Sequence, residues 1–260
     1  MLGRAKVERA GGMSPEFALR LDGVTKDFGG LRAVDGIALA VRPGERRALI
    51  GPNGAGKTTL FNLISGSLPV TAGTITIFGR DVTHKPAYVR AAQGLARTFQ
   101  ITNLFPDLTV LENCLLAVQA LTPTRFAMLR PVGAYSSLHA SARATLESVG
   151  LDGVGDALVK NLSHGEQRQL EIALALAGRP RVLLLDEPTA GLSPAESRLM
   201  AGLLARLDSA ITVLMIEHDM DIALELSPHV TVLHYGRVIA DGPRAEVRRD
   251  PQVREIYLGA

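Results

Sequence analysis

The stretch that decides the fold is GPNGAGKTT, residues 51–59. It matches the pattern G-x-x-x-x-G-K-[ST]. Residues 47–50 before it predict a short buried strand, and residues 58–64 predict the start of a helix. The pattern alone also fits a glycine-rich turn that caps an ordinary helix. The strand before it favours a phosphate-binding loop, in which backbone N–H groups and a helix N-terminus surround phosphate oxygens. We therefore expect an α/β fold.

Each part of this loop has an expected task. Glycines allow left-handed backbone turns, Lys57 reaches the outer phosphates, and the Thr58 hydroxyl is a Mg²⁺ ligand. The expected ligands are ATP and Mg²⁺. The loop residues that we expect to contact the nucleotide are Gly51, Pro52, Asn53, Gly54, Ala55, Gly56, Lys57, Thr58 and Thr59.

A second stretch, RVLLLDEP at residues 181–188, supplies carboxylates. Its apolar residues predict a strand buried on both faces, with Asp186 and Glu187 at the carboxyl end, where an open parallel sheet binds ligands. Asp186 is expected to hold Mg²⁺ through water, and Glu187 to act as general base or to orient the water. The alternative is that the two carboxylates are simply exposed to solvent at a strand end. The phosphate loop in the same chain disfavours this alternative.

From about Phe17 to Ala260 the chain resembles the ATP-binding subunits of ABC transporters. The resemblance rests on the two stretches above and on four further matches in order: Phe28 in KDFG, Gln100 in RTFQ, the signature LSHGEQ at residues 162–167, and His218 after an apolar run. It implies a P-loop ABC ATPase with a RecA-like mixed-sheet core, an N-terminal antiparallel β subdomain and an α-helical signature subdomain.

The resemblance also implies roles. Phe28 would stack on adenine, although it also fits a core residue at a strand end. Gln100 would sense Mg²⁺ and contact the membrane partner. His218 would contact the γ-phosphate and help to order Glu187, although it also fits a helix cap or a surface histidine. The expected catalytic residues are Lys57, Gln100, Glu187 and His218, and the expected metal ligands are Thr58, Gln100 and Asp186.

In the signature, Ser163, Gly165 and Glu166 are expected to open a helix whose N-terminus binds the γ-phosphate held by the opposite subunit. A serine at a helix start is also simply a cap. His164 replaces the glycine that most signatures have there. Ser193 stands where many relatives have aspartate, a departure that bears on signalling across the dimer and not on ATP binding.

Composition agrees with one ATPase domain. The chain has 260 residues, a net charge of +2 and one cysteine, Cys114, so it excludes an internal disulfide and indicates no nucleic-acid partner. No apolar run is long enough to span a membrane. We expect a disordered lead-in at residues 1–14, or a start at Met13, and a single domain at 15–260. Residues 15–100 and 180–260 would form the core, and 101–179 the helical subdomain, with an irregular insertion at 121–135.

Finer similarities narrow the transporter class. The run GLARTFQ at residues 94–100, the insertion after it, His164 in the signature and the ending VREIYLG resemble the longer ATPase of branched-chain amino acid importers. The resemblance implies two transmembrane permeases, a second ATPase subunit, an indirect solute-binding protein and a place on the cytoplasmic face of the membrane. Urea, short amides, other amino acids and lipopolysaccharide export remain alternatives. A soluble ABC ATPase acting on nucleic acid or ribosomes is disfavoured, because there is no coiled coil and no second phosphate loop. A kinase is disfavoured because it would not account for the signature at residues 163–167.

Overall fold

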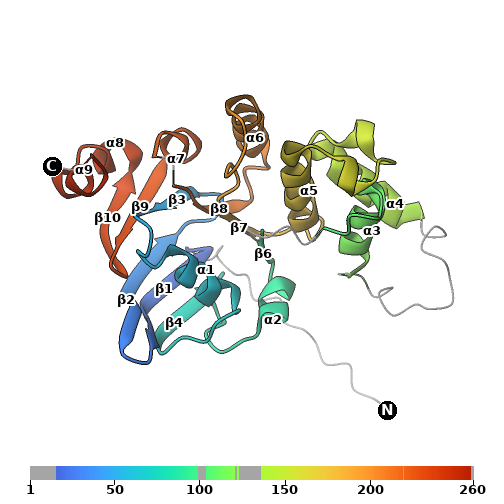
Figure 1. Cartoon of the computed structure of the whole chain (residues 1–260). Helices are drawn as coiled ribbons and strands as arrows, with labels where there is room; N and C mark the ends of the chain where they lie inside the picture. The colour runs from blue at the N-terminus through green and yellow to red at the C-terminus, as the bar shows by residue number, and fades with distance from the viewer. Residues whose placement is uncertain (1–15, 99–103, 121, 123–135, 219, 259–260) are drawn as a thin grey trace, which may run out of the picture.

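The computed structural model describes residues 16–98, 104–120, 122, 136–218 and 220–258, with Tyr257 and Leu258 as backbone only. The expected lead-in, Gln100 and nearly all of the expected insertion lie outside these residues. The described chain forms two sheets and a group of helices, which lies on the right of Figure 1. This arrangement confirms the expected fold class.

The larger sheet has six strands in the order β10-β9-β3-β8-β7-β6. Its neighbouring strands run parallel except for the β9–β10 pair. The strands are β3 (Arg46–Ile50), β6 (Leu95–Arg97), β7 (Val182–Asp186), β8 (Thr212–Ile216), β9 (His229–His234) and β10 (Arg237–Pro243). The antiparallel β10 makes the sheet mixed, as the resemblance implies. Only Tyr235 and Gly236 separate β10 from β9, and such a short turn permits only antiparallel pairing.

The central strands are buried on both faces, as the apolar run at residues 182–185 predicts. Along β7, Leu183 and Leu185 pack into one hydrophobic core, while Val182 and Leu184 pack into another on the opposite face. Neighbouring side chains of a strand point to opposite faces, so each apolar strand joins two cores. The sheet is thereby held between two layers, and its carboxyl edge is left for polar residues.

The smaller sheet is antiparallel, with the order β2-β1-β4-β5. Its strands are β1 (Leu19–Phe28), β2 (Leu31–Val41), β4 (Ala72–Ile77) and β5 (Arg80–Asp81). Helix α1 (Lys57–Ser65) packs between the two sheets through Leu60, Phe61, Leu63 and Ile64, which are all in the same core as β1. The expected N-terminal antiparallel β region is confirmed, and α1 anchors the phosphate loop to it.

The remaining helices surround these sheets. Those that form the group on the right of Figure 1 are α3 (Val110–Ala120), α4 (Ser136–Ser148) and α5 (His164–Leu176), with 3₁₀ turns at Asp152–Val154 and Val159–Asn161. The others are α2 (Ala87–Ala92), α6 (Pro194–Arg206), α7 (Met220–Leu226), α8 (Arg244–Val247) and α9 (Pro251–Leu258). Within the described ranges, no helix has the length and apolarity needed to cross a membrane.

Candidate functional site

Four segments end at one edge of the six-stranded sheet. The loop of residues 51–56 follows β3, Asp186 ends β7, Glu217 and His218 follow β8, and Thr98 follows β6. Since β3, β8, β7 and β6 run parallel, their carboxyl ends meet at the same edge. Polar residues gathered there form a site of the kind that open α/β sheets use for ligands.

Two glycines of the loop cannot be replaced by residues with side chains. Gly51 has φ 155°, and a Cβ there would lie 2.2 Å from the carbonyl oxygen of Leu233. Gly56 has φ 101°, and its Cβ would lie 2.5 Å from the carbonyl oxygen of Ala33. Gly56 is also the N-cap of α1 and, having no side chain, leaves the helix N-terminus uncapped. The first N–H groups of α1 therefore remain open to an anion.

Lys57 is folded back over the loop. Its side chain is buried, and its Nζ donates to the carbonyl oxygens of Gly51 at 2.6 Å and Pro52 at 3.0 Å. Burial lowers the pKa of Lys57, while the carboxylates of Glu187 and Asp186 act in the opposite direction. The ammonium is thus held beside the anion-binding N–H groups. Thr58, the next residue, is exposed.

Asp186 is almost fully buried, with an exposed fraction of 2%. Its Oδ2 lies 2.8 Å from Nη2 of Arg97. Its Oδ1 is buried and has no hydrogen-bond partner among the described residues. A buried carboxylate oxygen without a partner is costly unless a ligand or cation satisfies it. Oxygen ligands at this position fit Mg²⁺, which prefers carboxylates and water.

Glu187 and His218 form a close pair, with 2.6 Å between Oε1 and Nε2. Glu187 has φ 50°, a left-handed conformation that costs a residue with a side chain about 1–3 kcal/mol. The backbone N–H of Glu187 is held by the carbonyl oxygen of Ile216 at 3.0 Å. The turn therefore fixes the carboxylate in a strained position next to the histidine, which is the arrangement expected of a residue that orients a reacting water.

Glu217 lies beside the site, next to His218, and was not among the residues expected from the sequence. It is buried and accepts a hydrogen bond from Thr189 Oγ1 at 3.0 Å. Burial raises the pKa of Glu217 to about 7, and the Thr189 hydroxyl only partly opposes this. Its position between an apolar strand and His218 was a signal, but only the fold shows that the side chain turns inward.

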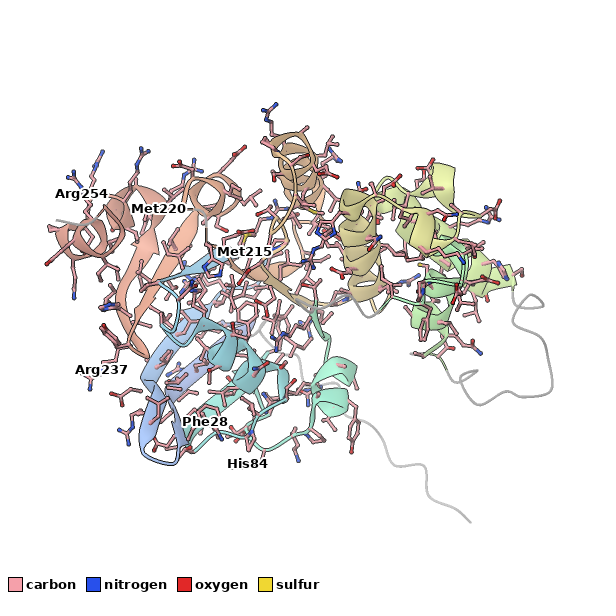
Figure 2. The ribbon with its side chains drawn as sticks, viewed as in Figure 1. Phe28, His84, Met215, Met220, Arg237 and Arg254 are labelled. Carbon is pink, nitrogen blue, oxygen red and sulfur yellow. The ribbon has the colours of Figure 1, made fainter. Side chains whose placement is uncertain are left out.

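Phe28 is at the end of β1 and is 46% exposed, which excludes the alternative that it is a core residue. The Nζ of Lys26 lies 5.1 Å from the centre of its ring. In Figure 2, Phe28 lies on the side of the antiparallel sheet, away from the group of α3, α4 and α5. An exposed aromatic face of this kind is available for stacking on a base.

The signature starts α5, as expected. Ser163 is the N-cap, its hydroxyl accepts from the N–H of Glu166, and the Glu166 carboxylate accepts from the N–H of Ser163 at 2.8 Å. The N–H of Gly165 donates to Oε1 of Glu196 at 3.3 Å. The cavity beside these residues has no lining residue from the phosphate loop. The chain by itself therefore does not bring the signature to its own loop. Gln100 lies outside the described residues.

The comparisons with known proteins agree with this geometry. The family model described as "ABC transporter" matches residues 34–190, and the model "Branched-chain amino acid ATP-binding cassette transporter" matches residues 237–260. BraF of Pseudomonas aeruginosa, a high-affinity branched-chain amino acid transport ATP-binding protein, is 40% identical over 93% of this chain and 97% of its own. LivG of Salmonella typhimurium, with the same description, has the same identity and coverage.

Solved structures give the same result. The ADP conformation of an ATP-binding cassette of an ABC transporter has a TM-score of 0.84 and 32% identity, and the match covers 94% of this chain and 99% of that one. A dimeric cassette in a post-hydrolysis state, bound to ADP and Pi, has a TM-score of 0.73 at 26% identity, covering 87% and 98%. The loop, the paired carboxylates and the family matches lead to one conclusion: the chain belongs to the ATP-binding family of the ABC transporters, whose members hydrolyse ATP.

Proposed function

We propose that this chain is an ATP-hydrolysing subunit of an importer of branched-chain amino acids. The observation that carries the proposal is the 40% identity with BraF over 93% of the chain, and the model for branched-chain amino acid cassettes at residues 237–260 supports it. The chain would act on the cytoplasmic face of the membrane with two permeases and a second ATPase subunit. A solute-binding protein would deliver the amino acid.

In this proposal the edge of the sheet binds the nucleotide. The open N–H groups of α1 and the Lys57 ammonium hold the phosphates, and Phe28 stacks on the base. The Nε2–H of His218 donates a hydrogen bond to the ionised Glu187 carboxylate and keeps it in place, so that Glu187 can orient and deprotonate a water. The left-handed turn at Glu187 keeps this carboxylate from relaxing away.

Mg²⁺ fits the same edge. Asp186, Thr58 and Gln100 would hold it, with Asp186 contributing the buried Oδ1 that has no partner among the described residues. When bound, the ion neutralises charge on the β- and γ-phosphates. Asp186 would contribute a fixed negative charge, and the Thr58 hydroxyl, which is exposed at the start of α1, would contribute a neutral oxygen.

The signature would act on a second subunit. Ser163, Gly165 and Glu166 begin α5 in the helical group, and their N-terminus would face a γ-phosphate bound by a partner ATPase. We also propose the division of the domain expected above, with residues 15–100 and 180–260 as the core and 101–179 as the helical subdomain. Closing two such subunits on two ATP molecules, and reopening them after hydrolysis, would drive the permeases.

Transport and partner recovery test the proposal. The gene is deleted in its own host, paralogous systems are silenced, and uptake of labelled leucine, isoleucine and valine is measured. The wild-type gene should restore uptake, and Glu187→Gln should not. Tagged Glu187→Gln protein, isolated from solubilised membranes with ATP, should bring two permeases and a second ATPase with it.

The alternatives have distinct outcomes. Unchanged uptake of all three amino acids after deletion, together with reduced uptake of urea or a short amide, would show that the transported solute is urea or an amide. The assignment as a transporter ATPase would still hold. Recovery of only soluble or nucleic-acid partners would overturn the transport proposal and leave the ATPase intact. The matched control is Glu225→Gln on α7, an exposed carboxylate that should leave both readouts unchanged.

A further inference from the structure

Arg97 connects three parts of the site. It ends β6, the edge strand of the larger sheet, and its side chain is buried. Its Nη2 lies 2.8 Å from Oδ2 of Asp186, and its Nη1 donates to Oδ1 of Asn62 at 2.6 Å and Oγ of Ser65 at 3.2 Å. Asn62 and Ser65 both belong to α1, the helix that begins at the phosphate loop. One guanidinium thus connects α1, which follows the phosphate loop, to Asp186 at the end of β7.

The next residue strengthens the connection. The Oγ1 of Thr98 accepts from the N–H of Asp186 at 3.2 Å, and the N–H of Thr98 donates to the carbonyl oxygen of Leu184. The segment that leaves β6 therefore holds both the backbone and the side chain of Asp186. A carboxylate held on one oxygen by a fork-shaped donor cannot rotate freely. Its other oxygen, Oδ1, then has a defined direction.

Arg90 shows what a purely structural arginine looks like in the same region. It is 1% exposed, and its guanidinium donates to the carbonyl oxygens of Leu63 and Ile64 at 2.6 and 2.7 Å, as well as to those of Thr83 and Lys85. All of these acceptors are backbone atoms, and none belongs to a residue of the proposed metal site. Both arginines hold the end of α1, but only Arg97 contacts Asp186.

We propose that Arg97 is a positioning residue for the metal, because it holds Oδ2 of Asp186 and leaves Oδ1 as the oxygen directed to Mg²⁺. The proposal rests on the proposed function, in which Asp186 binds Mg²⁺. Groups that orient a ligating carboxylate typically change metal affinity about 10–100-fold when they are removed. Loss of Arg97 should therefore weaken the contribution of Mg²⁺ to nucleotide binding, and leave binding of the metal-free nucleotide nearly unchanged.

The test measures binding instead of turnover. A fluorescent β,γ-imido analogue of ATP is titrated with EDTA and with excess Mg²⁺, and the ratio of the two Kd values gives the gain due to the metal. In Arg97→Gln this gain should fall at least about tenfold relative to the wild type, with the Kd in EDTA within about twofold. In Arg97→Lys, which keeps the charge but loses the fork, the loss should be intermediate.

Arg90→Gln and Arg90→Lys are the matched controls. They should lower the Tm, as the Arg97 variants do, and keep the wild-type gain from Mg²⁺. A wild-type gain in both Arg97 variants would overturn the positioning role. If Arg97→Gln does not fold, Arg97→Lys decides by the same ratio. If the wild-type protein binds the analogue equally well with and without Mg²⁺, the magnesium site itself is wrong, which is a different failure.

Discussion

The two helix starts that are proposed to hold phosphate differ in how they are capped. Helix α1 has Gly56 as its N-cap, which offers no side chain to the first N–H groups, and the Lys57 ammonium is bound to the loop carbonyl of Gly51. Helix α5 begins at Ser163, where a full capping box and the Glu196 carboxylate already use the N–H groups of Ser163, Glu166 and Gly165. An open start binds an anion at once, whereas a capped start must first exchange its internal acceptors for the incoming phosphate.

This difference suggests that the two helix starts bind phosphate at different stages. The loop at α1 would bind nucleotide in the isolated subunit, and the signature at α5 would contribute only when a partner brings a phosphate that competes with Glu196. The pKa of Glu196 is lowered, mainly by the Ser193 hydroxyl and also by the N–H groups of Ser193 and Gly165, so the group is charged at neutral pH. The competitor at the signature is therefore an anion, like the phosphate.

The largest effect is expected at the open start. Lys57→Ala removes the only side-chain cation that the structure places in the loop, and it should lower kcat for ATP by at least about 10²–10³-fold, because charge on the phosphates is no longer offset. Nucleotide affinity should also fall. Steady-state ATPase assays and equilibrium binding measure both. Normal turnover in this variant would show that the loop is not the ATP site.

Glu187→Gln tests whether the phosphate loop of one subunit and the signature helix of another close on the same ATP. The glutamine can still contact His218, but it cannot accept a proton, so kcat should fall about 10²–10⁴-fold while ATP still binds. The stalled protein should form an ATP-dependent dimer by size-exclusion chromatography, with the native second ATPase added if this chain does not pair with itself.

The control is Glu217→Gln, which changes the neighbouring buried carboxylate and keeps an acceptor for Thr189. It should retain most of the activity. A variant at Glu187 that hydrolyses ATP as fast as the wild type would assign the water-orienting role to another residue.

A smaller effect is expected at the capped start. Ser163→Ala removes the cap of α5 and should reduce the free energy of unfolding by about 1 kcal/mol. It should also lower ATPase activity about tenfold or more, because a γ-phosphate ligand is lost. Thr109→Ala is the matched control, since Thr109 caps α3 through the same pair of bonds with Glu112. Thr109→Ala should lose a similar free energy of unfolding and keep its ATPase activity. Equal ATPase activity in the two variants would show that Ser163 caps α5 and does not contact the γ-phosphate.

The smallest effect concerns Glu196. Glu196→Gln preserves the capping box of α6, because glutamine is equally suited to that position, but it removes the charge that Gly165 contacts. The ATP concentration for half-maximal hydrolysis should decrease about two- to fivefold, the range that a charge at a helix N-terminus commonly contributes. Glu112→Gln, at the capping box of α3, should leave it unchanged. An unchanged or raised value in Glu196→Gln would contradict competition at the signature.

Much of the site could be predicted because its elements are local patterns. The loop, the strand before it, Asp186 with Glu187, and the capped start of α5 each lie within a few consecutive residues, and their physical requirements are visible there. Cys114 is buried in α3, and burial raises the pKa of its thiol to about 11. Local chemistry determined the elements and most of the candidate ligands.

The contacts between distant residues could not be predicted from such patterns. Arg97 and Asp186 are 89 positions apart, and Gly165 and Glu196 are 31 apart. The sequence by itself determined a phosphate loop, a buried apolar strand that ends at Asp186 and a signature helix capped by a serine. Only the tertiary structure decided that Arg97 faces Asp186, that Glu217 is buried and that β10 turns back along β9, because these depend on which side chains the packed sheet brings together.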